Sequence, residues 1–227
     1  MRVKPGLTSS YWKCWTVQCR LYEMPKTFAA AKSMFNSTDE LRYGKAKALS
    51  GMVGGQEREQ TVLTPDWLLD AIREVAPIGL DPCTTPENPV GARFFCSVEG
   101  AAGTSQPSDV ALGFTGSDGL AIPWGWPLQR APLAACAYVN PPYSDLKDWL
   151  QKCSAEAGCG VQVYLLCPVR PQRRWFNEYT KGHTVVSLAP FPFKGHKSAF
   201  PAPLCLVCYN LPVPNLGKYE TGRWVQL

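Results

Sequence analysis

The fold is decided by residues 134–167, whose sequence is AACAYVNPPYSDLKDWLQKCSAEAGCGVQVYLLC. The apolar run from Ala134 to Val139 predicts a buried strand, and the run from Val161 to Cys167 predicts a second one. Between them, Ser144 to Ala157 predicts a helix that closes at Gly158. A strand, a helix and another strand in this order are typical of a parallel β-α-β unit.

The same alternation continues on both sides of this unit. Thr64 as N-cap and Pro65 in the first turn open a helix, which Pro77 and Gly79 end. A second helix is expected over Gln172–Tyr179, and strands over Ile78–Asp81, Ala92–Cys96, Thr184–Ala189 and Leu204–Tyr209. We therefore expect an α/β, Rossmann-like fold, with a mostly parallel doubly wound sheet and a C-terminal antiparallel hairpin. Ligands bind at the carboxyl ends of the strands in such sheets.

The rest of the chain divides around this domain, which we expect to span residues 61–210. Residues 1–60 form a basic N-terminal extension and linker of unknown function, with a capping box at Ser37 and Glu40 that predicts a short helix through Leu49. Residues 211–227 are expected to be a C-terminal tail. Gly100 to Pro132 is rich in Gly, Pro and Ser, and a stretch of this length favours a lid or recognition insert.

Composition narrows the class of protein. The 227 residues are 45% hydrophobic, enough for a core that needs neither a disulfide nor a metal. No apolar run approaches the roughly 20 residues of a membrane span, and the first fifteen residues lack the apolar stretch of a signal peptide. We therefore expect a soluble protein of a reducing cytoplasm.

The ten cysteines and two histidines do not predict a metal site. Cys205 and Cys208 form the one Cys-x-x-Cys pair, within an apolar run that reads as a strand. Residues three apart in a strand point to opposite faces, which favours a core pair over half of a zinc site. His183 and His196 lie far apart in the chain.

Charge is segregated along the sequence. Residues 1–60 hold 10 Lys/Arg against 5 Asp/Glu, residues 61–160 hold 5 against 11, and residues 161–227 hold 8 against 2. The total of +5 therefore conceals two basic ends around an acidic middle. Such segregation suits a protein that presents one surface to a polyanion, although unequal thirds are also common by chance.

The sharpest motif is Asn140-Pro-Pro-Tyr143, directly after the strand that ends at Val139. The amide oxygen of Asn140 and the carbonyl of Pro141 can both accept hydrogen bonds from an exocyclic amine, which frees the nitrogen lone pair for methylation. Pro141 and Pro142 stiffen the backbone, and Tyr143 offers a face on which a flipped-out base can stack. The structural alternative is a rigid turn with Tyr143 merely packed.

Together with the segments before it, this motif resembles the phage-type (Dam-like) DNA N6-adenine methyltransferases, which depend on S-adenosylmethionine. The resemblance covers roughly Thr61 to Tyr209. It is carried by Thr64-Pro65, Asp81-Pro-Cys-Thr-Thr-Pro-Glu-Asn88, Arg93-Phe-Phe95, Asp118-Gly-Leu120 with Trp124, Asn140-Pro-Pro-Tyr143 and Arg174-Trp-Phe176. It implies a methyltransferase fold, double-stranded DNA as the partner, and a bacterial cytoplasm, with a phage or prophage as the source.

The resemblance also implies roles for single residues. Thr64 and Pro65, at a helix N-terminus, would contact the methionine carboxylate of the cofactor. Asp81 and Pro82 would hold its amino and sulfonium end, and Asp118 would accept a hydrogen bond from its adenine amine. The simpler alternatives are a helix cap for Thr64 and turn residues for the two acids. The chain departs from the family where Thr84 and Thr85 replace a Gly-rich turn, and Glu99 is the one nearby candidate for the ribose-binding acid.

Basic residues of the C-terminal third fit nucleic acid. Arg170, Arg173 and Arg174 follow the strand that ends at Cys167, with Trp175 and Phe176 interleaved. Lys194 and Lys197 flank His196 in a turn between the last two strands. Such residues can bind phosphates beside a displaced base, or form a solvated helix face and a hairpin tip.

The expected activity is therefore methyl transfer to the N6 amine of adenine in DNA, by direct displacement on a flipped-out base. The tetrapeptide is equally compatible with cytosine N4, RNA adenine or a glutamine amide, although the basic ends disfavour a peptide substrate. A different class is a methyltransferase-like domain that binds nucleic acid without turnover, which the missing Gly-rich turn favours. The recognition sequence and the oligomeric state stay open.

Overall fold

The structure is a computed structural model that describes residues 62–85, 87–97, 102–104, 118–131 and 134–227. These residues fall within one compact unit, residues 60–227. The expected basic extension, its helix after Ser37, much of the expected insert and the ribose-binding candidate Glu99 lie outside the described residues.

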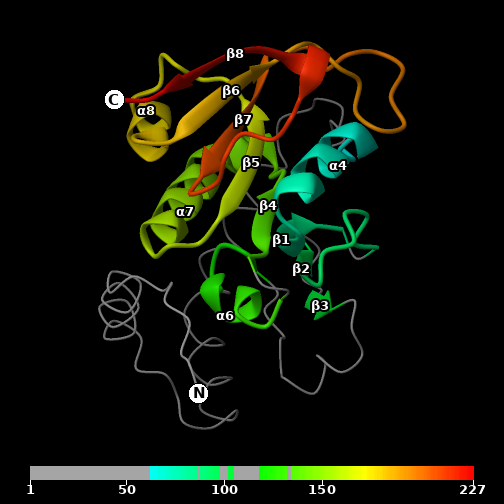
Figure 1. Ribbon diagram of the computed structural model, residues 1–227, viewed down its shortest axis with the longest axis vertical. Coiled ribbons are helices and arrows are strands. Elements are labelled where there is room, and N and C mark those ends of the chain that lie inside the picture. The colour runs from blue at the N-terminus through cyan, green and yellow to red at the C-terminus, as the bar shows by residue number, and fades with distance from the viewer. Residues whose placement is uncertain (1–61, 86, 98–101, 105–117, 132–133) are drawn as a thin grey trace, which may run out of the picture. The chain divides into compact units, whose positions relative to one another are not determined.

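The domain is α/β, built on an eight-stranded sheet in the order β3-β2-β1-β4-β5-β7-β6-β8 (Figure 1). The strands are β1 Ile78–Thr84, β2 Phe94–Ser97, β3 Ala102–Thr104, β4 Cys136–Val139, β5 Val163–Pro168, β6 Thr184–Leu188, β7 Leu204–Tyr209 and β8 Glu220–Val225. The pairs β2-β1, β1-β4 and β4-β5 are parallel, whereas β3, β7, β6 and β8 join through antiparallel pairs. The sheet is therefore mixed rather than mostly parallel, although its centre has the expected parallel strands.

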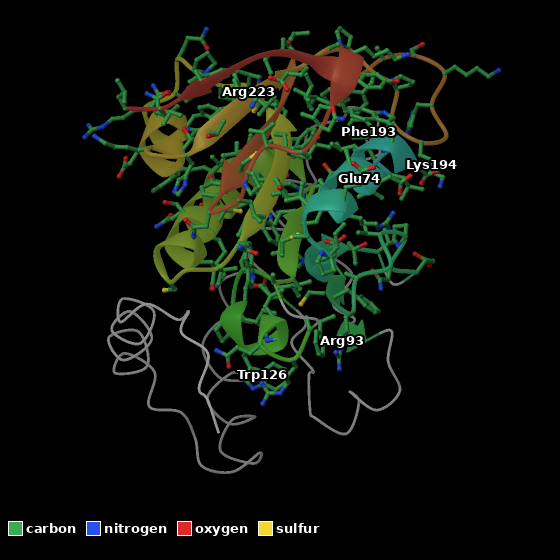
Figure 2. The ribbon with its side chains drawn as sticks, viewed as in Figure 1. Glu74, Arg93, Trp126, Phe193, Lys194 and Arg223 are labelled. Carbon is green, nitrogen blue, oxygen red and sulfur yellow. The ribbon has the colours of Figure 1, made fainter. Side chains whose placement is uncertain are left out.

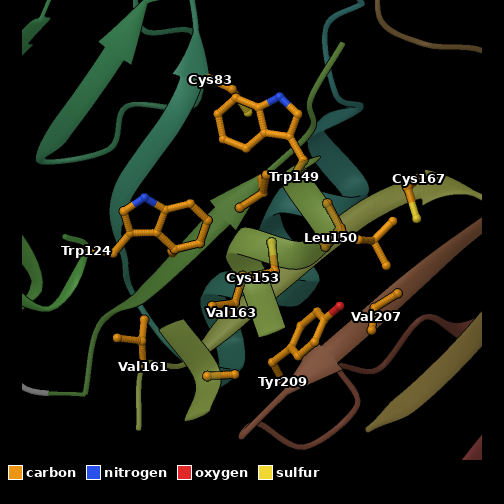
Figure 3. Packing of buried hydrophobic residues seen from close by; sticks show 14 of the residues in the cluster. Cys83, Trp124, Trp149, Leu150, Cys153, Val161, Val163, Cys167, Val207 and Tyr209 are labelled. Carbon is orange, nitrogen blue, oxygen red and sulfur yellow. The ribbon is translucent and has the colours of Figure 1, made fainter. Parts of the chain in front are cut away.

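Helices cover both faces of the sheet (Figure 1). The helical segments are α4 Asp66–Val75, α6 Gly125–Leu128, η1 Tyr143–Asp145, α7 Leu146–Gly158, α8 Arg174–Thr180 and η2 Gly217–Tyr219. On one face, Trp149 and Leu150 of α7 and Phe176 of α8 pack on the strands, as Figure 3 shows for the first two. On the other face, Leu68 and Ile72 of α4 do so. This two-sided burial explains the uninterrupted apolar sequence of the central strands.

Alternate residues of each central strand enter the two cores. In β4, Ala137 and Val139 face α7, while Cys136 and Tyr138 face α4. In β7, Cys205 and Cys208 likewise lie in opposite cores, which confirms the expectation that they cannot share a metal. All eight cysteines among the described residues are free thiols.

Several expected elements are confirmed with shifted ends, and some were not foreseen. β7 has the predicted bounds, while β1 extends three residues further, to Thr84. Residues 211–227, expected to be a tail, contribute β8 to the sheet beside β6. The weak signal of β8 has a physical cause, because an edge strand alternates between half-buried and exposed residues and carries little apolar sequence.

Part of the expected insert is packed rather than free. Trp124 is fully buried, and its indole N–H donates to the Gly119 carbonyl at 2.8 Å. β1 accommodates this segment with Gly79, where a Cβ atom would lie 2.7 Å from the Cβ of Ala131. Residues 118–131 are therefore packed on the sheet, with Trp124 in the core of the domain. Among the described residues, no helix is long and apolar enough to cross a membrane.

Candidate functional site

A cleft opens where the sheet changes direction. From β1 the strand order runs one way to β2 and β3, and the other way to β4 and β5, and such a switch point is where open α/β sheets bind ligands. Three segments line the cleft: Val62–Thr64 before α4, the end of β1 with the loop after it, and the end of β4 from Tyr138 to Pro142. Thr64, Asp81 and Asn140, all singled out from the sequence, meet there.

The amide of Asn140 is held from both sides. Its Nδ2 donates to the Val62 carbonyl oxygen at 2.9 Å and to Thr64 Oγ1 at 3.3 Å. Its Oδ1 accepts a hydrogen bond from the hydroxyl of Tyr143 at 3.2 Å. An amide oxygen has two lone pairs, so Oδ1 can accept a second bond from a ligand amine.

Pro141 and Tyr143 complete the turn after β4. Pro141 is buried, and Tyr143 begins η1. The ring of Tyr143 is half-buried, and the ring of Phe200 meets it edge to face at 5.5 Å between centroids. Burial raises the pKa of the Tyr143 phenol far above its usual value, so the group stays protonated.

Thr64 does not cap α4, contrary to the expectation. Pro65 takes the N-cap position, which carries no side-chain cap hydrogen bond. The Thr64 hydroxyl instead lies 2.7 Å from the hydroxyl of Tyr138, a residue of β4 that is fully buried. The Thr64 hydroxyl therefore bonds to a residue of β4, at the cleft, and not to the backbone of its own helix.

Asp81 is a buried acid in the middle of β1. Its side chain is 4% exposed, and Oδ1 accepts a hydrogen bond from the backbone N–H of Cys83 at 3.1 Å. Burial raises the pKa of Asp81 from 3.8 to about 7, and hydrogen bonds from Cys83 and Thr84 limit the rise. A buried carboxyl in a cleft, poised to ionise near neutral pH, is suited to receive a cation.

Asp118 lies beside the cleft rather than in its lining. It is exposed, and its Oδ1 accepts from the N–H of Leu120 at 2.9 Å, the turn geometry that its Gly-rich sequence favours. The next residue presses against β1, because a Cβ atom at Gly119 would lie 1.9 Å from the Pro82 carbonyl oxygen. Asp118 and Asp81 lie near the same thiol: after burial, their negative charges are the next causes that raise the pKa of Cys96 to about 12.

The arginines follow β5, whose carboxyl end lies at the same edge as that of β4. Arg170, Arg173 and Arg174 are exposed, and Arg173 is the N-cap residue of α8. Of the two aromatics interleaved with them, Trp175 is half-buried and Phe176 lies wholly in the core. Phe176 therefore cannot stack on a base, which corrects that part of the expectation.

The two lysines of the loop between β6 and β7 differ in their surroundings. Lys194 lies beside α4 (Figure 2), and its Nζ is 2.9 Å from both carboxylate oxygens of Asp66. The backbone N–H of Lys194 also donates to the Leu63 carbonyl at 2.8 Å, so this residue joins the loop to the segment before α4. Lys197 is exposed.

Tyr138 is the site residue that the sequence reasoning missed. It lies in the expected strand two positions before Asn140, and residues two apart in a strand share a face. This two-residue repeat was the sequence signal that could have indicated Tyr138 as a site residue. Within the described ranges, no group of three or more His, Cys, Asp or Glu side chains is arranged to hold a metal ion. No protein-family model and no curated protein matches the chain.

Proposed function

We propose that this protein transfers a methyl group from S-adenosylmethionine to the N6 amine of adenine in DNA, by direct displacement on a flipped-out base. The observation that carries the proposal is the meeting of Thr64, Asp81 and Asn140 in one cleft at the switch point of the sheet. The parallel strands at its centre, followed by antiparallel strands, are consistent with a Rossmann-like methyltransferase fold.

The donor set of the cleft fits the amino-acid end of the cofactor. A zwitterion needs a hydrogen-bond donor for its carboxylate and an anion for its ammonium group. Thr64 offers a hydroxyl beside the N-terminus of α4, and Asp81 offers a buried carboxylate. When bound, the cofactor supplies an electrophilic methyl group on a sulfonium centre. Pro65 and Pro82 shape the backbone next to these two side chains.

Asn140 and Pro141 would receive the target amine. The second lone pair of Asn140 Oδ1 and the carbonyl of Pro141 accept the two amine hydrogens, so the nitrogen lone pair is released from the ring. The half-buried ring of Tyr143 supports the base, a contact worth about 1–3 kcal/mol in related stacking. Because the Tyr143 phenol stays protonated, it is assigned no role as a base.

Asp118 is proposed to meet the adenine of the cofactor. One carboxylate oxygen is used in the turn with Leu120, and the other is left for a ligand N–H. The tight contact of Gly119 with Pro82 keeps this acid beside the end of β1.

The DNA backbone is proposed to lie along the edge that carries Arg170, Arg173 and Arg174. Since β4 and β5 are parallel, these arginines and Asn140 follow strands that end on the same side of the sheet. Lys197 is free to add a phosphate contact, whereas Lys194 would have to exchange its bond with Asp66 for one.

The alternative is a domain that binds nucleic acid without turnover. It is favoured by the loop after β1, which lacks a Gly-rich turn. In its place, Asn88 exchanges two hydrogen bonds with the backbone of Ala92, and Arg73 donates to the Val90 carbonyl. A loop held in this way has little freedom to adapt to a cofactor.

The two functions separate in a direct experiment. Calorimetry measures S-adenosylmethionine binding, and transfer of a labelled methyl group is followed on a duplex with adenine. The control duplex carries purine, which lacks the amine, at the same positions. Binding and transfer to adenine alone support the proposal. DNA binding without cofactor binding supports the alternative and overturns the proposed methyl transfer.

A further inference from the structure

A chain of three hydrogen-bonded side chains connects the core to the cleft. The phenol of Tyr138 lies 2.7 Å from Thr64 Oγ1, which lies 3.3 Å from Asn140 Nδ2. Within the described part of the chain, Thr64 is the one hydrogen-bond partner of the Tyr138 phenol. Thr64 lies 74 positions before Tyr138 and 76 positions before Asn140 in the sequence.

The direction of these bonds follows from burial. The distance alone leaves either hydroxyl as the donor. Because Thr64 is the one described acceptor of the wholly buried phenol proton, we assign the donor to Tyr138. Thr64 Oγ1 then accepts from Tyr138 and from Asn140, and both of its lone pairs are occupied. With that assignment, the proton of Thr64 is left for a ligand in the cleft that Thr64 lines. Burial also raises the pKa of Tyr138 well above its usual value, which keeps the donor protonated.

The orientation of Asn140 depends on this arrangement. An Asn amide can face either way, and its neighbours decide which end is presented. Here the nitrogen donates to two acceptors, the Val62 carbonyl and Thr64 Oγ1. The amide oxygen therefore faces away from the segment that holds these acceptors. Both acceptors belong to the segment before α4, and the bond to Tyr138 ties that segment to β4.

We propose that Tyr138 is a positioning residue: through Thr64 it holds the segment that orients the Asn140 amide, so that oxygen rather than NH2 meets the target amine. The inference rests on the proposed function for its consequence in catalysis. A reversed amide would set two N–H donors against the amine and could not draw out its lone pair. Although Tyr138 is among the residues that line the cleft, its phenol bonds to Thr64, and in this assignment it acts only through that residue.

The chain offers a matched control. Tyr164 of β5 pairs with Tyr138 in the sheet, faces the same core, and donates its hydroxyl to the Pro212 carbonyl at 2.6 Å. Tyr138→Phe and Tyr164→Phe each remove one phenol oxygen from neighbouring strands. Only the first removes a bond that leads to Asn140.

The first measurement is independent of any activity. The side-chain NH2 signals of Asn140 are assigned in the 15N spectrum by their loss in Asn140→Asp, and their exchange with solvent is compared between variants. We expect Tyr138→Phe to accelerate that exchange about tenfold and Tyr164→Phe to leave it unchanged. Unchanged exchange in Tyr138→Phe overturns the inference.

The second measurement is methyl transfer to duplex DNA. Tyr138→Phe should lower kcat about five- to tenfold with KM for DNA altered less than about twofold, while Tyr164→Phe keeps both values. Faster amide exchange with an unchanged kcat also overturns the inference. If the wild-type protein transfers no methyl group, the proposed function fails, and the exchange rates still decide whether Tyr138 orients the amide.

A second pair of variants covers the case in which Tyr138→Phe does not fold. Thr64→Val keeps the shape of the side chain and removes the hydroxyl, whereas Thr64→Ser retains it. Faster exchange at Asn140 in Thr64→Val, with recovery in Thr64→Ser, supports the link from Thr64 to Asn140 on which the inference depends. Equal exchange in the two variants overturns the inference.

Discussion

The hydroxyl of Thr64 lies 3.3 Å from the Nδ2 atom of Asn140, although 76 positions separate the two residues in the chain. One belongs to the segment that opens α4, and the other to the turn that follows β4. In the proposed function, the first meets the cofactor and the second meets the base. A direct hydrogen bond between them means that the two halves of the site are built as one unit.

Replacing Asn140 tests the centre of this unit. Asn140→Ala removes the amide oxygen that is proposed to accept from the target amine, and we expect kcat for methyl transfer to fall by about 10²–10³-fold. The melting temperature should fall only modestly, because the three hydrogen bonds of the amide are lost at a half-buried position. Asn215→Ala is the control, since Asn215 is an exposed turn residue whose Oδ1 accepts from Gly217. Equal rates in the Asn140 variant and the wild type would remove Asn140 from the mechanism.

Asp81 should make stability depend on pH. Its pKa is about 7 in the folded protein against 3.8 in a free side chain, so the folded state holds the proton more tightly. The fold is then favoured at low pH and loses stability as pH rises from about 4 to about 7. The loss amounts to at most about 4 kcal/mol. Asp81→Asn cannot ionise and should be more stable than the wild type at pH 8, but not at pH 4.

The measurement is the difference in free energy of unfolding between wild type and Asp81→Asn at several pH values, in which the titration of other groups cancels. In the proposed function, the ionised carboxylate of Asp81 binds the ammonium group of the cofactor. Affinity for S-adenosylmethionine should therefore rise as pH increases through 7 in the wild type and stay low in Asp81→Asn. An affinity for S-adenosylmethionine that does not change with pH across this range would contradict the proposed contact between Asp81 and the cofactor.

Gly119 should tolerate no side chain. A Cβ atom there would lie 1.9 Å from the carbonyl oxygen of Pro82, a backbone atom that cannot rotate away. We expect Gly119→Ala to lower the free energy of unfolding by about 1–3 kcal/mol and to weaken cofactor binding through the displaced Asp118. Gly125→Ala is the control, because a Cβ atom at Gly125 meets nothing within 4 Å. Denaturant melts compare the two, and equal stabilities would contradict the contact.

The basic surface is tested by the salt dependence of DNA affinity. Arg173→Ala should weaken binding and reduce the slope of log affinity against log salt by about one, because one phosphate contact is lost. Lys194→Ala should reduce the slope less, since its charge is already paired with Asp66. Equal slopes for the wild type and Arg173→Ala would show that Arg173 contacts no phosphate and that DNA binds at another surface.

Much of the fold could be predicted because its signals are local. The strand Leu204–Tyr209 is wholly apolar since it is buried on both faces, and the structure confirms its bounds. The helix expected over Ser144–Ala157 is observed over Leu146–Gly158, where a 3₁₀ turn takes the first residues. The strand β8 escaped prediction because its pattern comes from pairing with β6 at the edge of the sheet.

Some residues of the candidate site could also be expected from the sequence, whereas their bonding partners could not. Asn140 was recognisable from the chemistry of its tetrapeptide after a predicted strand, whereas the roles of Asp81 and Thr64 came from the resemblance of the segments around them to a known family. The partners of these residues were not recognisable. The bond of Lys194 to Asp66 joins positions 128 apart, and no local pattern announces it.

The sequence alone specified the alternation of strands and helices, the tetrapeptide after β4 and the opposite burial of Cys205 and Cys208, because periodicity and turn chemistry act over a few residues. Only the tertiary structure decided that Thr64 bonds to Tyr138 instead of capping α4, and that the nitrogen of the Asn140 amide faces Val62. These contacts depend on the order in which β1 and β4 lie side by side. That order follows from burying both faces of one sheet, which is a property of the whole domain.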